Sequence, residues 1–389
     1  MVGQPAAALQ PPVAVDEEAP KSDERYFLMK ALSATRVGNV LEQHKISISG
    51  WTHLSFTASS ARNEQLPMGF NYRANEFLLQ QNWLRIERPT DTESKTASFG
   101  FRADTILPGS DYRFTIARGL FDGQLTANNG SPNRYGFDPI QFYGEAYLPN
   151  VGQGLTLKLG RTFCQYGVES NDAPSNALWS HAYTFIYNPF THTGLMGTLK
   201  LSDAWSVQSG IMLGNDVFID PASEPYYMGS VKWAPKDGSD SVLFAVILGS
   251  GRFNQAEQFH NPQIFDVVYT HKFNDKLNYT FEGLYGFTTN VPFADGPGSA
   301  FWFGILNYVT YAFTDKLSGT TRLEFFDDFQ GQRTGFEGLY TVITAGLAWK
   351  PCRAITMRPE IRFDYNSESR PFSNRHGLFT AGTDLIIRW

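Results

Sequence analysis

The last stretch of the chain, Gly377–Trp389, reads G-L-F-T-A-G-T-D-L-I-I-R-W and ends on an aromatic side chain. Alternate side chains of a β-strand point to opposite faces. One face of this stretch is therefore apolar from Phe379 to Trp389, whereas the other carries small or polar side chains such as Thr380 and Asp384. An apolar face with aromatic side chains at both ends is typical of a strand that separates lipid from a watery interior.

The preceding segment, residues 355–365, shows the same division more sharply. Its even positions carry Arg358, Glu360, Arg362 and Asp364, and its odd positions carry no charge. A shift of one residue in register would turn all four charges towards the apolar side. Because a basic side chain that faces lipid at the bilayer midplane costs about 2–4 kcal/mol, we expect these four charges to face inwards.

The composition narrows the ways in which such a chain can cross a membrane. Of its 389 residues, 15% are aromatic and only 18% are charged. A transmembrane helix needs about 20 consecutive apolar residues, and the longest apolar run, residues 242–248, is much shorter. A closed β-barrel is the remaining structure that satisfies every backbone group in lipid. The net charge of -6 and the lack of a basic cluster argue against nucleic acid as a partner.

The connections between the alternating segments are long and short in turn. The long ones lie near 59–75, 105–136, 165–188, 215–225, 251–263, 289–299, 329–338 and 367–376. The short ones lie at 89–95, 149–154, 202–203, 235–239, 274–276, 314–316 and 351–354. Outer-membrane barrels have short periplasmic turns and long extracellular loops. We therefore predict an all-β fold over residues 45–389, a closed antiparallel transmembrane barrel of about 16 strands with both chain ends on the periplasmic side.

Residues 1–44 are expected to lie outside the barrel as a periplasmic leader. Residues 1–23 are rich in Pro and Ala and then acidic, which predicts disorder. Residues 24–44 are compatible with a short helix, whose alternative roles are a plug or a tether. The start of the chain lacks the basic and apolar regions of a secretory signal. An exported barrel needs such a signal, so we expect it to have been removed from this sequence.

Four short motifs carry a resemblance to a known family. They are Gly50-Trp51, L-K-L-G-R at 157–161, Y-G-V-E at 166–169 and N-P-F-T-H-T-G at 188–194. With these motifs, residues 45–389 resemble the OmpL-like β-barrel porins, the second family of that provisional name, from Gram-negative-type envelopes. The resemblance implies a single outer-membrane barrel that acts as a porin. Cys164, within T-F-C-Q-Y-G, departs from the small or polar residue that is more usual in the family.

No residue pattern points to catalysis, so we expect no enzymatic activity, cofactor or metal site. The seven histidines are scattered, and neither a G-x-S-x-G motif nor a glycine-rich phosphate loop occurs. His181 and His192 lack the spacing of metal ligands, and we interpret them as rim residues. The alternative to the absence of a metal site is calcium bound in a loop at Asp327 and Asp328. Adjacent acids in a wet loop are more often simply hydrated.

Charged side chains on the inward faces and on one loop are the candidate pore-lining residues, because pore selectivity comes from diameter and charge. They are Arg102, Asp104, Glu145, Lys158, Glu169, Asp172, Lys200, Lys232, Asp266, Glu282, Arg322, Glu324, Arg358, Glu360, Arg362 and Asp384.

Two loops are rivals for the constriction of this pore. The loop at 165–188 follows a segment with glycines at both ends, Gly160–Gly167, and is long enough to fold inwards. It carries two acids, Glu169 and Asp172, and we hypothesise that this loop narrows the pore and faces a wall of arginines on the later strands. These arginines are Arg322, Arg358 and Arg362. The loop at 105–136 is the alternative, with Arg113, Arg118 and Arg134.

The predicted function is an outer-membrane porin, surrounded by lipid, that lets small hydrophilic solutes and ions diffuse through a water-filled channel. The alternative is a scaffold barrel whose lumen is plugged by its N-terminal segment or by a partner protein. A soluble β-sandwich would also alternate, but it would not explain the strict order of long and short connections. Monomer and homotrimer both stay open, and strands 241–249 and 300–313 are the expected subunit contacts.

Overall fold

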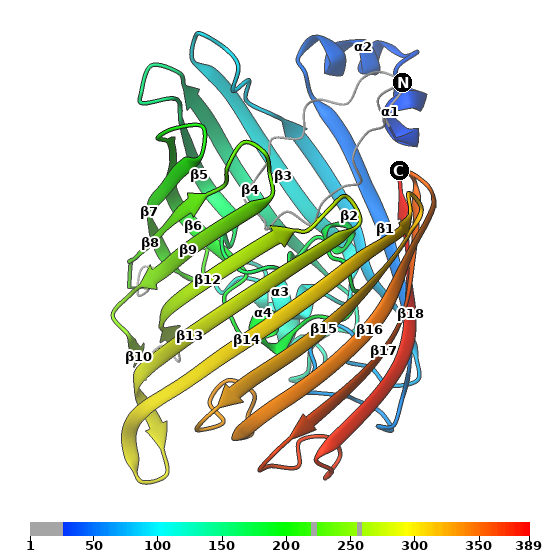
Figure 1. Ribbon diagram of the computed structural model, residues 1–389, viewed down its shortest axis with the longest axis vertical. Helices are drawn as coiled ribbons and strands as arrows, with labels where there is room; N and C mark the ends of the chain where they lie inside the picture. Colours follow the sequence, from blue (N-terminus) through cyan, green and yellow to red (C-terminus); the bar gives the residue numbers. More distant parts are fainter. Residues whose placement is uncertain (1–25, 219–223, 255–258) are drawn as a thin grey trace.

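The computed structural model describes residues 26–218, 224–254 and 259–389, and its strands form one closed barrel (Figure 1). Strand β1 (Ser47–Ser59) pairs antiparallel with β18 (Gly377–Arg388), with Leu54 opposite Leu385, and this pairing closes the sheet. Around the ring, β1 to β9 and β12 to β18 pair with their neighbours in chain order, which gives sixteen strands in the described residues. The predicted closed antiparallel barrel of about 16 strands is confirmed.

The other strands of the ring are 8 to 19 residues long. They are β2 (Phe77–Arg88), β3 (Ser98–Gly109), β4 (Gly136–Leu148), β5 (Leu155–Phe163), β6 (Thr191–Lys200), β7 (Trp205–Asn215), β8 (Tyr226–Trp233), β9 (Asp240–Leu248), β12 (Gln263–Lys272), β13 (Leu277–Phe293), β14 (Gly296–Thr314), β15 (Leu317–Asp328), β16 (Gly338–Cys352) and β17 (Ile355–Asn366). A small hairpin of β10 (Arg252–Asn254) and β11 (Phe259–Asn261) lies in the connection between β9 and β12.

One predicted loop is wrong. Residues 289–299 were expected to be a long connection, but β13 continues to Phe293 and β14 begins at Gly296, so that a long hairpin projects beyond the ring (Figure 1). The pairing passes a bulge between Thr288 and Val291, where Asn290 adopts a left-handed φ of 61°. Asn tolerates that conformation, so the Pro- and Gly-rich sequence, typical of a loop, still forms a ladder.

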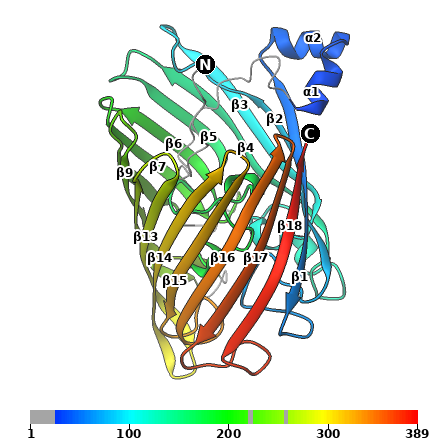
Figure 2. The same cartoon turned by 45° about the vertical axis from the view of Figure 1, so that its right-hand side comes forward.

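Both ends of the described chain lie at the end of the barrel with the short turns (Figures 1 and 2). Helices α1 (Phe27–Leu32) and α2 (Arg36–Gln43) lie beside the rim, outside the ring, and the Ile48 N–H donates to Met29 Sδ at 3.4 Å. No helix in the described residues is long and apolar enough to cross a membrane. The opposite end carries the long connections, which is the extracellular end in an outer-membrane barrel.

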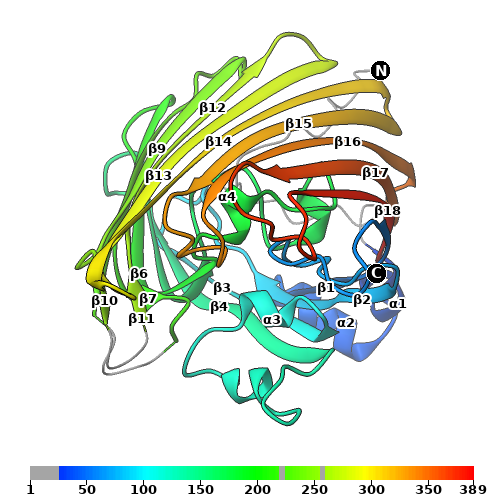
Figure 3. The same cartoon turned by 90° about the horizontal axis from the view of Figure 1, so that it is seen from below.

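In β17 the charged side chains face the inside of the barrel and the apolar ones face outwards, as the alternation in the sequence predicts. Arg358 and Arg362 are buried, whereas Ile361, between them in register, is 55% exposed on the outer wall. The charges are buried because extracellular loops fold into the ring. Short helices α3 (Tyr112–Thr115) and α4 (Tyr183–Ile186) and the 3-10 turns η2 (Asp122–Leu125) and η3 (Ala173–Ser175) belong to these loops. Figure 3, seen from the long-loop end, shows α4 within the ring.

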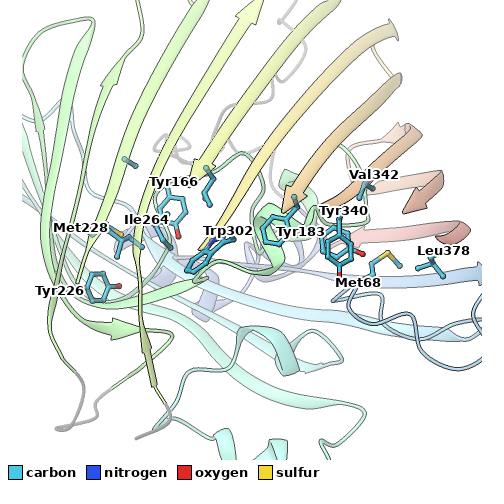
Figure 4. Packing of buried hydrophobic residues seen from close by; sticks show 14 of the residues in the cluster. Met68, Tyr166, Tyr183, Tyr226, Met228, Ile264, Trp302, Tyr340, Val342 and Leu378 are labelled. Atoms are coloured by element: carbon cyan, nitrogen blue, oxygen red, sulfur yellow. The ribbon is translucent and has the colours of Figure 1, made fainter. Parts of the chain in front are cut away.

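The inner face of the extracellular half is a packed core. Tyr183 of α4 stacks near Tyr340 of β16, with ring centroids 4.7 Å apart, and its ring also lies 6.0 Å from Phe326 of β15. Trp302 and Met68 join the same cluster from β14 and from the connection after β1 (Figure 4). Burial of these aromatic side chains holds the loops against the wall, so the inward-folded loops are part of the barrel structure.

Candidate functional site

The connection between β5 and β6, residues 164–190, enters the ring and is called the inner loop here. Its two ends are tied together at the wall, because the Cys164 N–H donates to the Phe190 carbonyl at 2.8 Å. Asp216, after β7, accepts from the N–H groups of Phe190 and Thr191 at 3.1 and 2.8 Å. In a ring of sixteen strands, β15 and β16 lie opposite this point. The inner loop reaches that opposite wall, where it contacts β15.

Carboxylates on the wall accept hydrogen bonds from the backbone of the inner loop. A carboxylate oxygen accepts hydrogen bonds, so it suits an N–H group that has no partner in a sheet. The four carboxylates and the N–H groups that they accept are Asp266 with Gly167 (3.1 Å), Glu282 with Val168 (2.9 Å), Glu324 with Thr184 (2.7 Å) and Glu360 with Trp179 (3.1 Å). They come from β12, β13, β15 and β17.

Arginines on the same wall donate to the carbonyls of the inner loop. The pairs are Arg322 with Ser180 (2.6 Å), Arg358 with Ala173 (3.0 Å) and Asn176 (2.6 Å), and Arg362 with His181 (2.6 Å). Guanidinium groups are donors only, so they suit the carbonyls as the carboxylates suit the amides. Buried backbone polar groups need partners. The wall carboxylates accept from the N–H groups of the inner loop, and the wall arginines donate to its carbonyls.

Glu169 is the acid of the inner loop that lies deepest in this network. Its carboxylate accepts from Arg322 Nη1 at 2.8 Å and from the Ala182 N–H at 3.1 Å, and it lies 2.6 Å from His181 Nδ1. The Tyr308 hydroxyl donates to the same carboxylate. Burial alone would raise the pKa of Glu169, but the Arg322 charge and the hydrogen bonds from His181 and Tyr308 lower this pKa to about 2. Glu169 is therefore ionised at neutral pH.

Asp172, the second acid of the inner loop, lies elsewhere. It is 3.8 Å from Arg85 Nη2 on β2 and accepts from the Ser175 hydroxyl at 2.7 Å. Beside it, Gln81 Nε2 of β2 donates to the Asn171 carbonyl at 2.8 Å. The inner loop thus contacts β2 as well as the later strands, and Asp172 lies on the β2 side, beside Arg85.

The rival loop also folds inwards, but its arginines contact other loops. Arg134 pairs with Glu76 at 3.0 Å, and the Arg113 guanidinium lies 4.1 Å from the centroid of the Tyr72 ring. Arg161 fixes this loop to the wall, because it donates to the Thr115 carbonyl at 2.7 Å and to Asp138 at 2.8 Å. Its predicted start at residue 105 is wrong, because β3 continues to Gly109.

The remaining candidate residues lie nearer the short-turn end. Asp384 pairs with Arg358 and lies 2.8 Å from His53 Nε2, deep in the ring. The other pairs are Arg102 with Asp104 (3.0 Å), Lys158 with Glu145 (3.0 Å) and Lys200 with Asp203 (3.7 Å). Lys232 occupies the same inward face of β8 as Met228, which is buried. These residues do not contact the inner loop, apart from Arg358.

Sequence reasoning missed several inward charges. Arg85 lies on β2 beyond a register shift opposite His53 and Leu54, so the alternation counted from the start of the strand assigns it to the wrong face. Arg161 follows Gly160, whose φ of 138° interrupts the alternation of β5. Arg85 and Glu87 are two residues apart on β2, so they share a face. These two charges were the signal that could have identified this face as the inward one.

The alternative of a calcium site at Asp327 and Asp328 finds no support in the described residues. Asp327 and Asp328 point to opposite faces of β15, as neighbours in a strand do. Asp328 faces inwards and accepts from the N–H groups of Arg333 at 2.9 Å and Thr334 at 2.7 Å. Within residues 26–218, 224–254 and 259–389, no group of three or more His, Cys, Asp or Glu side chains is arranged to hold a metal ion.

Known structures share this fold. The outer membrane channel DcaP of Acinetobacter baumannii has a TM-score of 0.58 at 10% identity, over 88% of this chain and 97% of its own. The anion-selective porin of Comamonas acidovorans has a TM-score of 0.56 at 10% identity, over 88% and 99%. OmpT of Vibrio cholerae, in a trimer form, has a TM-score of 0.53 at 10% identity, over 88% and 99%.

The sequence itself matches a family model. That model, described as "Putative beta-barrel porin-2, OmpL-like", matches residues 45–388, whereas no curated protein matches the sequence. The resemblance drawn from the four short motifs is confirmed, and so is the predicted outer-membrane porin. Because the match spans nearly the whole chain and coincides with the closed barrel, the chain belongs to the OmpL-like family of β-barrel porins.

Proposed function

We propose that the protein is a passive-diffusion porin of the outer membrane and that the inner loop sets the width of its channel for small hydrophilic solutes and ions. The observation that carries this proposal is the path of the inner loop, from β5 across the lumen to carboxylates and arginines on β12 to β17. A ring of about 16 strands leaves an aqueous channel. A segment fixed across that channel narrows it, and no catalytic group is needed for passage.

Single-channel conductance in a planar bilayer tests this role. Replacing Glu169 and Asp172 with Ala removes both acids of the inner loop, and we expect a larger or noisier conductance because the loop loses its contacts with Arg322 and Arg85. Glu93→Gln is the matched control, since Glu93 is exposed in the short turn between β2 and β3. A conductance equal to that of the unaltered protein would contradict the proposed constriction.

The scaffold alternative is less well supported. Residues 26–44 lie outside the ring, beside the rim, so the described part of the leader does not fill the lumen. The rest of the leader, residues 1–25, lies outside the described residues. Removal of residues 1–44 should leave the conductance of the refolded barrel unchanged, whereas a plug would give a much larger conductance after removal.

We also propose a homotrimer, with a contact surface different from the expected one. The outer faces of β9 and β14 carry exposed apolar side chains such as Phe244 and Ile305, which suit lipid. On the outer face of β1 and β2, by contrast, Thr52 donates to Asn82 Oδ1 at 3.1 Å. Polar groups are costly against hydrocarbon, so this pair favours a contact with a second copy.

Cysteine cross-linking tests the contact. With Cys352 replaced by Ser, Thr52→Cys should give cross-linked subunits in the membrane, and Phe244→Cys should not. The reverse result would return the contact to β9, and cross-linking at neither position would favour a monomer.

A further inference from the structure

Four lysines lie on the inner face of the barrel near the short-turn end, below the inner loop. They are Lys200 of β6, Lys232 of β8, Lys272 of β12 and Lys350 of β16, and together they are called the lysine arc. Each lies within two residues of the periplasmic end of its strand. The strands run from β6 around to β16, so the lysine arc spans a large part of the periplasmic mouth.

The alternation of each strand places these lysines inwards. Lys232 and Lys272 share a face with Met228 and Val268, which are buried inside the ring. Lys200 and Lys350 share a face with Met196 and Ala348, which are also buried. The side chain of Lys200 is 54% exposed and that of Lys272 is 31% exposed, so the lysine arc borders open space in contrast to the buried arginines above it.

The wall around the lysine arc presents hydroxyl and amide groups. Neighbouring strands exchange side-chain hydrogen bonds there, with Gln208 to Thr198 at 3.2 Å, Ser230 to Gln208 at 3.1 Å, Thr270 to Thr280 at 3.3 Å and Thr310 to Thr320 at 2.9 Å. Hydroxyl and amide groups donate as well as accept. They can therefore assist a cationic side chain in holding an oxyanion.

The acids near the lysine arc are in the turns, not on the inner wall. Asp203 lies 3.7 Å from Lys200 and Asp275 lies 3.2 Å from Lys272, but both acids are well exposed. Exposed pairs of this kind are weak and screened by salt. Neither Lys232 nor Lys350 has an ion-pair partner within residues 26–218, 224–254 and 259–389. The field of the lysine arc is therefore largely uncompensated at the mouth.

On the opposite side of the mouth, several charges are paired. Lys158 lies 3.0 Å from Glu145, and Arg102 lies 3.7 Å from Glu87 and 3.0 Å from Asp104. In the upper half, the carboxylates Asp266, Glu282 and Glu324 are bonded to the inner loop. The lysine arc thus adds positive charge to the inner face that these acids do not offset.

We propose that the lysine arc binds small oxyanions, such as phosphate and carboxylate-bearing solutes, and makes the channel prefer anions. This inference rests on the proposed channel function and names its solute class. Lysine offers a compact charge with three rotatable donors, and the neighbouring hydroxyl groups complete the shell of an oxyanion. Charge along a pore sets its ion preference, so the lysine arc selects solutes where they enter or leave on the periplasmic side.

Reversal potentials under a potassium chloride gradient give the first test. We expect chloride to be more permeant than potassium by about two-fold or more, and the double variant K232Q/K350Q to bring this ratio to about one or below. K236Q is the matched control, because Lys236 is 81% exposed in the turn after β8 and pairs with Asp203. Heat-modifiable gel mobility checks that each variant has folded. A potassium preference, or an unchanged ratio in K232Q/K350Q, would overturn the inference.

Inorganic phosphate gives a second test that needs no current. Broadening of the phosphorus resonance of phosphate by the refolded protein in detergent should be lost in K232Q/K350Q and kept in K236Q. Equal broadening in all three proteins, or none in the unaltered protein, would overturn the oxyanion site. A folded barrel that broadens the resonance but conducts no ions would overturn the proposed channel function and leave the site in place.

Discussion

The two halves of the lumen use charge in different ways. In the extracellular half, the charges of β12 to β17 bind backbone groups of the inner loop, as Glu360 does with Trp179 and Arg362 with His181. In the periplasmic half, Lys232 and Lys350 face the lumen without an ion pair in the described residues. Both groups of charges face inwards because side chains alternate along the strands. Where a loop is folded against the wall, the charges bind that loop; where none is, they face the lumen and its solutes.

The types of basic residue follow this division. The extracellular half uses Arg161, Arg322 and Arg362, each of which binds at least one loop carbonyl. The periplasmic mouth uses the lysines of the arc. A planar guanidinium fixes several acceptors at once and is weakly hydrated, whereas an ammonium group is compact and strongly hydrated. Arginine therefore suits a buried fastening and lysine a wet mouth.

The largest difference between the halves should come from Arg322→Ala. This change leaves the buried Glu169 carboxylate without its guanidinium partner, and breaking a buried pair costs about 3–5 kcal/mol. Denaturant unfolding in detergent should show that loss, and limited proteolysis should cut the inner loop. Lys350→Ala is the matched change in the other half and should cost about 0–1 kcal/mol. Equal losses would remove the distinction between the halves.

Glu360→Gln should have an intermediate effect. The carboxylate accepts from the N–H groups of Trp179 and Ser180 at 3.1 and 3.3 Å, and the uncharged amide keeps the shape but accepts more weakly. Hydrogen bonds to charged groups contribute about 1.5–3 kcal/mol, and a part of that should be lost. The free energy of unfolding, measured beside that of Arg322→Ala, gives the order. A neutral result would mean that the inner loop does not depend on this carboxylate.

Acid should weaken the extracellular half selectively through Glu169. The folded pKa of Glu169 is about 2, below its ordinary value of 4.5, since Arg322, His181 and Tyr308 outweigh burial. Its contribution to stability is therefore fully present above about pH 4.5 and is lost as the pH falls through about 2. The free energy of unfolding of the unaltered protein should fall across this window more than that of Glu169→Gln. Parallel pH profiles would contradict the assignment.

Asp172→Ala should have the smallest effect. Its carboxylate is 16% exposed and 3.8 Å from Arg85, and an ion pair this long contributes about 0–1 kcal/mol. Conductance should change little compared with Glu169→Ala, because Asp172 lies against β2 and not within the Arg322 network. A change as large as that of Glu169→Ala would show that the inner loop depends on its contact with β2.

Strands in which charged and apolar side chains alternate regularly made most of the fold predictable. In β17, charge at every second position specifies the register and the inward face. The order of long and short connections gave the strand number, and the spacing of Gly160 and Gly167 suggested a loop that turns inwards. The sequence misled where a bulge or a left-handed residue shifts the alternation, as at Asn290 and Gly160.

The contacts of the site were harder to predict than the barrel. Arg358 and Arg362 bind carbonyls of the inner loop, and backbone groups leave no trace in the type of residue that carries them. The path of the inner loop depends on packing of Tyr183 against Tyr340, which are more than 150 positions apart. Pairing between Asp172 and Arg85 depends on the same path, so spacing alone could not assign it.

Fastening of the inner loop and ion preference are separate functions of the two halves of the lumen. One planar-bilayer experiment tests this division by recording conductance and reversal potential for two double variants. We expect E169Q/R322Q, which removes one charge of each sign, to change the conductance but to keep the chloride-to-potassium permeability ratio. We expect K232Q/K350Q to lower that ratio and to change the conductance less. An altered permeability ratio in E169Q/R322Q, or an unaltered ratio in K232Q/K350Q, would show that the two halves do not divide these functions.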